Sequence, residues 1–311
     1  MTIARAPGKV ILFGEHAVVY GRPAIAVPVS GVEATAIVED ASPGQGITVI
    51  ALDLGRCFRV DEAPSDDPLR LIVELTLRRL GIESPPALTI ALRSTIPIAR
   101  GLGSGAAIST AIVKALSQHL GVTLPPSEIS ALVYEVEKIY HGTPSGIDNT
   151  VIAFESPVFF IKGRPIQTFT MGQPFSLVIG DTGISSPTRD VVLDVRKAWE
   201  RNRAYYETLF DRIGKVAEEG RKAIEEGDLM RVGRLMDENH SLLVEMGVSC
   251  AELDELVEAA RKAGALGAKL SGAGRGGNMV ALVEPETASA VEKALKEAGA
   301  SAVLITQVRG K

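Results

Sequence analysis

The sequence predicts an α+β fold in two domains, and three observations support this prediction. The chain has 311 residues, more than most single domains contain. Period-two apolar patterns, which indicate strands, dominate up to about residue 180. Charged helical patterns follow from residue 187 to 263, and the chain ends in a strand–helix–strand unit. Since the change of composition falls near residues 165–185, we expect domains over residues 1–170 and 171–311.

The composition excludes several classes of protein. A net charge of −5 gives no general attraction to nucleic acid or to an anionic membrane. No apolar run approaches the roughly 20 residues that span a bilayer, and the first residues resemble a strand and not a signal peptide. Cys57 and Cys250 are too far apart for a disulfide framework, so we expect isolated buried thiols. These features predict a cytoplasmic small-molecule enzyme without nucleic-acid or membrane partners.

The opening segment, residues 3–21, places charged groups in an otherwise apolar stretch. Lys9, Glu15 and His16 are expensive to bury unless they are paired or face a polar site. They are therefore candidates for a ligand-facing surface, although strand alternation could instead turn them to solvent. Two strands are expected over residues 24–40, a hairpin over residues 47–52 and 57–60, and a further strand over residues 87–93. A helix is expected over residues 69–80.

The stretch over residues 96–120 combines a glycine loop with the start of a helix. Gly101, Gly103 and Gly105 permit positive φ, and a helical apolar spacing begins at Ala106. The unpaired N–H groups of a helix N-terminus attract anions such as nucleotide phosphates. A simple tight turn is the alternative. Residues 95–100 intervene between the preceding strand and the loop, so the dinucleotide-binding pattern is not met. No Gly-Lys-Ser/Thr follows the loop, so the P-loop pattern is not met either.

A helix is expected from Ser127, as its N-cap, to residue 140. Glu137 lies at the edge of its apolar stripe, so it could reach a cleft or form a solvated flank. The turn-rich loop over residues 141–149 then carries Ser145 and Asp148, before a strand-like segment over residues 151–161. Loops between rigid elements often carry chemistry, but these are also ordinary turn residues.

The second half contains a strand over residues 174–180, followed by Asp181 and Thr182. Helices are expected over residues 190–216, 217–226, 228–246 and 251–263. Gly272, Gly274 and Gly277 repeat a G-x-G-x-x-G spacing, but they precede a strand over 279–284, which excludes a dinucleotide-binding motif. A helix over 285–298 and a strand over 301–308 complete the chain.

Three separated segments, residues 7–16, 101–107 and 269–277, together resemble the signature motifs of the GHMP kinases, a superfamily of small-molecule kinases. Within this superfamily, residues 14–21 and 141–149 resemble the mevalonate kinases. At Tyr20 the sequence departs from the many mevalonate kinases that carry histidine. Asn278 is similar to the archaeal and bacterial type.

The resemblance implies an N-terminal domain like the second domain of ribosomal protein S5 and a ferredoxin-like C-terminal domain, with ATP and substrate in the cleft. It implies an ATP-dependent phosphorylation of the 5-hydroxyl of (R)-mevalonate in isoprenoid biosynthesis, with Mg²⁺ and with ATP as co-substrate. Related substrates stay open: phosphomevalonate, the mevalonate 3-hydroxyl, homoserine or a sugar. A catalytically silent nucleotide-binding regulator is a further alternative. A homodimer is one option for the assembly.

The resemblance also implies roles for individual residues. Asp148 and Lys9 would be catalytic, and Ser104 and Glu137 would hold the metal. The residues implied to bind ATP are Pro97, Arg100, Gly101, Leu102, Gly103, Ser104, Gly105, Ala106, Ala107, Gly272 and Gly274. The residues implied to bind the second substrate are Glu15, His16, Tyr20, Ser145, Asp148 and Thr182.

Overall fold

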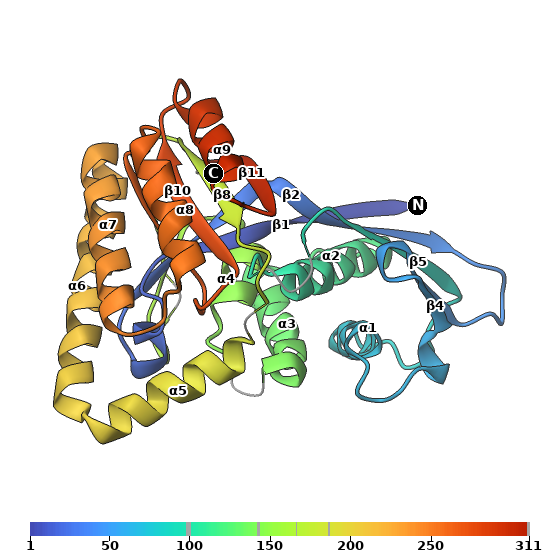
Figure 1. Cartoon of the computed structure of the whole chain (residues 1–311). Coiled ribbons are helices and arrows are strands. Elements are labelled where there is room, and N and C mark those ends of the chain that lie inside the picture. The colour runs from blue at the N-terminus through green and yellow to red at the C-terminus, as the bar shows by residue number, and fades with distance from the viewer. Residues whose placement is uncertain (98–100, 142–143, 166, 186, 310–311) are drawn as a thin grey trace. The chain divides into compact units, whose positions relative to one another are not determined.

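The computed structural model describes residues 1–97, 101–141, 144–165, 167–185 and 187–309 (Figure 1). The chain divides into two compact units, and neither is continuous in sequence. Unit 1 comprises residues 1–8, 32–98 and 102–155, and unit 2 comprises residues 9–31, 99–101 and 156–311. The long strands β1 (Thr2–Phe13) and β2 (Ala24–Asp40) therefore contribute residues to both units. The predicted domains over residues 1–170 and 171–311 stay a prediction.

Unit 1 contains a sheet in the order β4-β3-β5-β2. Its strands are β3 (Ile47–Ala51), β4 (Arg56–Arg59), β5 (Leu88–Ser94) and the second half of β2. The predicted hairpin is confirmed, because β3 and β4 pair antiparallel, joined by the 3₁₀ turn η2 (Leu52–Leu54). β3 runs parallel to β5. η3 (Val60–Glu62) follows β4.

β2 is a single strand of 17 residues, so the prediction of two strands over residues 24–40 is wrong. Ser30 and Gly31, a polar residue and a flexible one, lie in the middle of this strand. Their polar groups hydrogen-bond to β11 (Ala302–Val308). The Gly31 N–H donates to Thr306 Oγ1 at 3.1 Å, and the Ser30 hydroxyl donates to the Gln307 carbonyl at 3.1 Å. The partner strand thus keeps the backbone extended.

The helices of unit 1 are α1 (Pro68–Arg79), α2 (Ser104–His119), α3 (Pro126–His141) and α4 (Ile147–Phe154). α2 packs against the other three, and its alanine-rich face is buried. α3 begins at Pro126, whose fixed φ suits the first helical position, so Ser127 is not the N-cap that we predicted.

α4 corrects the strand predicted over residues 151–161. Val151 and Ile152 favour a strand by propensity, but both are buried in a short helix packed against α2 and α3. Asn149 Nδ2 donates to the Ser130 carbonyl at 3.1 Å and to Ser130 Oγ at 2.9 Å, which anchors α4 to α3. Only the short strand β6 (Val158–Phe160) remains of the prediction. It pairs with the first residues of β2 and with β7 (Gln167–Thr168).

Unit 2 contains an antiparallel sheet in the order β11-β8-β10-β9. Its other strands are β8 (Phe175–Asp181), β9 (Gly267–Ser271) and β10 (Asn278–Val283). The helices α7 (Leu229–Glu245) and α8 (Ala251–Lys262) pack on β9, and α9 (Ala288–Glu297) packs on β8 and β11. The predicted strand–helix–strand ending is therefore confirmed as β10, α9 and β11.

The charged helical region breaks at a different place from the predicted one. α5 (Thr188–Arg201) and α6 (Arg203–Glu226) meet at Asn202, whose φ of −139° and ψ of 66° are not helical. α6 then continues through residues 216 and 217, where we expected a boundary, because its buried stripe runs unbroken from Leu209 to Ile224. Figure 1 shows α6 beside α7, and the two helices pack together.

Two smaller expectations can also be compared with the structure. Cys57 is exposed on the edge strand β4 and Cys250 is half-buried, so the prediction of buried thiols is wrong for both. β4 lies at the end of the sheet order and pairs with β3 on one side. Among the described residues, no helix has the length and apolar character needed to cross a bilayer.

Candidate functional site

The glycine loop before α2 has the predicted backbone at its described residues. Gly101 and Gly103 take φ values of 73° and 75°, and α2 begins directly afterwards at Ser104. The Ala107 N–H closes the first helical turn by donating to the Gly103 carbonyl at 2.9 Å. Gly105 is helical and does not need positive φ, so that detail of the prediction is wrong. The loop thus presents the N-terminus of a 16-residue helix, a geometry suited to phosphate.

The other residues predicted around the phosphates differ in exposure. Pro97 and Gly101 are exposed, and Ser104 is half-buried at the first position of α2. The side chains of Leu102, Ala106 and Ala107 are buried, so they can offer a ligand only their backbone groups. Arg100 lies outside the described residues.

Glu137 lies on α3 and is only 4% exposed, so its reading as a solvated flank is wrong. A carboxylate is rarely buried without a charged or polar function. α3 packs against both α2 and α4, the two helices that carry Ser104 and Asp148. The structure therefore brings the helices of these three predicted residues together in unit 1.

Asp148 occupies the first turn of α4 and is half-exposed. The turn before it is fixed by Gly146 at a φ of 88° and by Ser145 Oγ, which accepts from the Ile147 N–H at 3.4 Å. Thr150 Oγ1 donates back to the Gly146 carbonyl at 2.6 Å. These contacts fix the backbone that carries Asp148 at the N-terminus of α4, where the helix dipole favours a carboxylate.

A pocket in unit 1 contains residues that the sequence did not reveal. It is lined by Ala51, Asp53, Leu92, Arg93, Ser94, Ile96 and Ile108. The Asp53 carboxylate accepts from the Ser94 N–H, which ties η2 to the end of β5. Ser94 and Ile96 precede the glycine loop and Ile108 lies in the second turn of α2, so the pocket adjoins the loop. The walls of this pocket are mainly apolar, with a few polar groups.

In unit 2 the three charged residues of the opening segment are all buried, so their reading as solvent-facing is wrong. Lys9 is 4% exposed, Glu15 1% and His16 6%. Glu15 forms an ion pair with Lys269 of β9, which is completely buried and also donates to the Leu270 carbonyl at 2.6 Å. Burial raises the pKa of Glu15 and lowers the pKa of Lys269, because both charges lose their hydration. The pairing opposes both shifts and makes the burial tolerable.

His16 connects the opening segment to the second glycine run. Its φ of 60° is unusual for a residue other than glycine, and its Nε2 lies 2.9 Å from the Ala273 carbonyl. Burial lowers the pKa of His16 to about 4, so the ring is neutral at pH 7. The nitrogen that faces the carbonyl must then carry the proton and donate it. Ser271 Oγ adds a second link by donating to the Ile11 carbonyl at 2.9 Å.

The second glycine run is held by backbone contacts. Arg275 N–H donates to the Val248 carbonyl at 2.8 Å, and Gly277 N–H donates to the Ile184 carbonyl at 3.0 Å. A Cβ on Gly274 would lie only 1.9 Å from the Val248 oxygen. Thr182, half-buried after β8, donates from both its N–H and its hydroxyl to the Gly277 carbonyl at 2.9 and 3.0 Å. In unit 2, His16 and Thr182 thus contact the loop that carries Gly272 and Gly274, and Glu15 contacts Lys269 on the strand before it.

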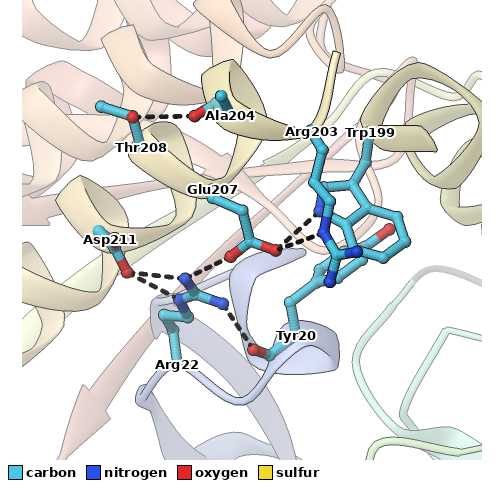
Figure 2. Close-up of polar contacts among 8 residues, drawn as sticks. All are labelled: Tyr20, Arg22, Trp199, Arg203, Ala204, Glu207, Thr208 and Asp211. Carbon is cyan, nitrogen blue, oxygen red and sulfur yellow. Dashed lines mark hydrogen bonds and ion pairs between the residues drawn. The ribbon is translucent and has the colours of Figure 1, made fainter. Parts of the chain in front are cut away.

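Tyr20 is half-buried in η1 (Ala17–Tyr20), and its surroundings were not foreseen. Its ring stacks on Phe210 of α6, with the ring centroids 4.1 Å apart. The Tyr20 ring also lies 5.3 Å from the ring of Trp199, and Figure 2 shows these two residues together. An aromatic residue near the end of a helix gives no sequence signal for a partner almost two hundred positions away.

Two family models match the chain. The GHMP kinases N terminal domain matches residues 69–156, and the GHMP kinases C terminal domain matches residues 221–301. The first match covers α1 to α4 of unit 1, and the second covers much of unit 2. The chain belongs to the GHMP kinase family.

Within this family the chain is similar to mevalonate kinases. It is 38% identical to the mevalonate kinase of Pyrococcus furiosus, over 98% of this chain and 96% of that protein. It is 32% identical to that of Saccharolobus solfataricus, over 92% and 91%. The crystal structure of L. major mevalonate kinase in complex with R-mevalonate has a TM-score of 0.85 at 31% identity, covering 100% of this chain and 97% of that one.

The structure of the Methanococcus jannaschii mevalonate kinase has a TM-score of 0.86 at 28% identity, covering 99% of this chain and 98% of that one. These similarities confirm the predicted two-domain α+β GHMP kinase fold and the prediction of a kinase.

Proposed function

We propose that this protein is a mevalonate kinase, which transfers the γ-phosphoryl group of ATP to the 5-hydroxyl of (R)-mevalonate in isoprenoid biosynthesis. The observation that carries the proposal is the similarity over nearly the whole chain to proteins of that name, one of which was crystallised with R-mevalonate. The geometry of each unit supports it, because unit 1 offers a phosphate-binding helix start and unit 2 offers a network of buried polar groups.

ATP is proposed to bind along the start of α2. The N–H groups of residues 104–106 would donate to its phosphates. The residues just before them in the loop would also contact ATP: Pro97, Arg100, Gly101 and Leu102. The pocket lined by Ser94, Ile96 and Ile108 is proposed to take the adenine, because it adjoins the glycine loop and has apolar walls. Gly272 and Gly274 are proposed to steady the phosphates from their loop.

The residues proposed to hold Mg²⁺ fit a hard cation. The Ser104 hydroxyl and the Glu137 carboxylate are oxygen donors of the kind that Mg²⁺ prefers, and their helices pack together. Among the described residues, no group of three or more His, Cys, Asp or Glu side chains could hold a metal ion by itself. Bound there, the ion would neutralise charge on the β- and γ-phosphates.

Asp148 is proposed to orient the attacking hydroxyl and to take up its proton. A carboxylate is a weak base, but a loose transition state demands little nucleophilic strength, so positioning and charge stabilisation carry most of the catalysis. Lys9 is proposed to stabilise the negative charge on the transferring group. Its burial at 4% exposure supports this role, because a cation acts more strongly where water is excluded.

Mevalonate is proposed to contact the segment from Glu15 to Tyr20, together with Ser145 and Thr182. Since Glu15, His16 and Thr182 are already bound to Lys269, Ala273 and Gly277, we propose that they shape the pocket and that the Tyr20 hydroxyl supplies a donor. We further propose a cytoplasmic protein without nucleic-acid partners, in keeping with the net charge of −5. A homodimer is proposed as one assembly, to be tested by light scattering.

The test is a coupled assay of ADP release with a panel of alcohols: mevalonate, phosphomevalonate, homoserine and galactose. We expect mevalonate to give the highest kcat/KM, with phosphate on the 5-oxygen of the product. Good turnover of another acceptor with none of mevalonate would assign the protein to a different GHMP kinase. ATP binding without turnover of any acceptor would indicate a regulator.

A further inference from the structure

The ring of Tyr20 is held by a cluster on α5 and α6 whose members all belong to unit 2. Phe210 is completely buried and stacks on Tyr20 with an interplanar angle of 15°. Trp199, near the end of α5, approaches the Tyr20 ring at a tilt of 49°. In the described part of the chain, no group hydrogen-bonds the Tyr20 hydroxyl. The ring is therefore fixed while its hydroxyl is available to a ligand.

Arg22 secures the backbone of Tyr20 (Figure 2). Its Nη1 donates to the Tyr20 carbonyl at 2.9 Å, its Nη2 donates to Glu207 Oε2 at 2.5 Å, and its Nε donates to Asp211 Oδ1 at 3.0 Å. Every nitrogen of the guanidinium group is thus engaged, and two carboxylates balance its charge. Arg22 is therefore an anchor for Tyr20 and is not the cation that would receive an anionic substrate.

Glu207 is the residue that joins these parts. Its Oε1 accepts from the indole N–H of Trp199 at 2.9 Å, while its Oε2 accepts from Arg22. The hydrogen bonds from Trp199 and then from Arg22 lower the pKa of Glu207, which keeps the carboxylate ionised. Asp211 contacts the same guanidinium but not Trp199, and its side chain is 68% exposed, against 31% for Glu207. Glu207 therefore bridges Trp199 and Arg22, and Asp211 does not.

We propose that Glu207 is a positioning residue for the acceptor: by holding Trp199 and Arg22 in place, it aims the Tyr20 hydroxyl at an oxygen of the alcohol substrate. This inference rests on the proposed function, which places Tyr20 at the substrate. It assigns α6 a part in substrate recognition that the motifs of the family do not contain, because Glu207 lies outside all three. The acceptor would provide a carboxylate or hydroxyl oxygen to the phenol as donor.

The test is a double-mutant cycle with Tyr20→Phe and Glu207→Ala. Each single variant is expected to raise KM for mevalonate about tenfold, the size of one lost hydrogen bond, with KM for ATP nearly unchanged. The double variant should be no worse than Tyr20→Phe, because Glu207 acts through the Tyr20 hydroxyl. Additive effects, or a normal KM in either single variant, would overturn the proposal.

Asp211→Ala is the matched control, since it removes a carboxylate from the same arginine but leaves the bridge to Trp199. Its KM for mevalonate is expected to stay within about twofold of the wild-type value, as for other exposed ion pairs. If Glu207→Ala does not fold, Trp199→Phe takes its place in the double-mutant cycle. Phenylalanine keeps an aromatic ring at position 199 but lacks the N–H that donates to Glu207. A normal KM in Trp199→Phe would contradict the proposal.

Fluorescence provides a readout that a purely structural role would not change. Trp199 is the single tryptophan of the chain, so the intrinsic emission reports on this cluster alone. Mevalonate should shift the emission of the wild type and of Asp211→Ala, and the shift should be lost in Tyr20→Phe at the same concentration. An unchanged wild-type emission at saturating acceptor would overturn the proposal. If the panel identifies another acceptor, the same cycle is run with it, so that the proposed function can fail while this inference is still judged.

Discussion

The two glycine-rich loops use the same residue for different purposes. In residues 101–107, Gly101 and Gly103 take positive φ so that α2 can start with an open N-terminus. In residues 272–277, Gly274 is needed because another backbone passes too close for any side chain. The polar groups beside the loops differ in the same way. Ser104 and Asp148 are half-exposed at helix starts, whereas Glu15, His16 and Lys269 are buried and bonded to one another. The polar groups at the first loop are thus left partly open to solvent, whereas those at the second are engaged within unit 2.

The largest effect is expected from Gly274→Ala. The new Cβ would lie 1.9 Å from the Val248 oxygen, at a φ of +82°, so the loop and the segment that follows α7 must separate. We expect insoluble protein, or a fall in melting temperature of more than about 10 °C, because backbone cannot yield as a flexible side chain does. Gly272→Ala is the control, with a φ of +98° and no atom within 4 Å of the new Cβ. Equal melting temperatures for the two variants would show that the close approach of Val248 does not require a glycine at position 274.

Asp148→Asn tests the chemistry of the ligand-facing side. The change keeps the shape of the side chain, so the melting temperature should stay close to the wild-type value while kcat falls about 10²-fold, in line with the loss of a general base. Steady-state kinetics with mevalonate measure this. Asp190→Asn is the matched control, because it also removes a carboxylate from the first turn of a helix but in exposed α5. A near-normal kcat with an unchanged pH profile would show that Asp148 is not the base.

Gly103→Ala separates a ligand effect from a folding effect at the first loop. A φ of 75° costs an alanine about 1 kcal/mol, so the start of α2 should shift and KM for ATP should rise about tenfold. Gly121→Ala, at the other end of α2 with a φ of +82° and no atom within 4 Å of the new Cβ, carries the same backbone cost away from the loop. Parallel ATP titrations compare the variants. A similar rise in KM for ATP in Gly103→Ala and Gly121→Ala would show that the loop does not bind the phosphates.

The smallest expected effect is on the stability of the folded protein at acid pH. Burial lowers the pKa values of His16 and His240 to about 4, from 6.5 in the unfolded chain. As the pH falls below 6.5, the unfolded state takes up protons that the folded state does not, so stability is lost down to about pH 4. At pH 5.5 each histidine should cost about 1 kcal/mol.

The variant that tests this prediction is His240→Asn, whose amide oxygen can still accept the Leu270 N–H that His240 Nδ1 accepts at 3.3 Å. Denaturant titrations at pH 7 and pH 5.5 should show a smaller loss for this variant than for the wild type. Glu15, whose pKa is raised by burial, acts in the opposite sense, so the difference between the proteins is the relevant quantity. An equal loss would mean that His240 is not buried as a neutral ring.

Local sequence was sufficient for the elements whose signals lie within a few residues. The periodicities of α1 and α8 and the alternation of the β3–β4 hairpin predicted them to within one or two residues. The glycines before α2 predicted its positive φ values in the same way, because conformational freedom is a property of the residue itself. The three motifs also sufficed to identify the family, since their residue types and order can be read without any structure.

Tertiary structure decided the features that depend on partners far away in sequence. Glu15 and Lys269 are 254 positions apart, so no local pattern could predict that each makes the burial of the other tolerable. The helical state of residues 151–154 and the burial of Glu137 were likewise set by the packing of α2, α3 and α4. The same holds for the contact between Tyr20 and Phe210. The sequence specifies which groups the chain carries, but whether a polar group faces a ligand or braces the fold depends on which residues pack around it.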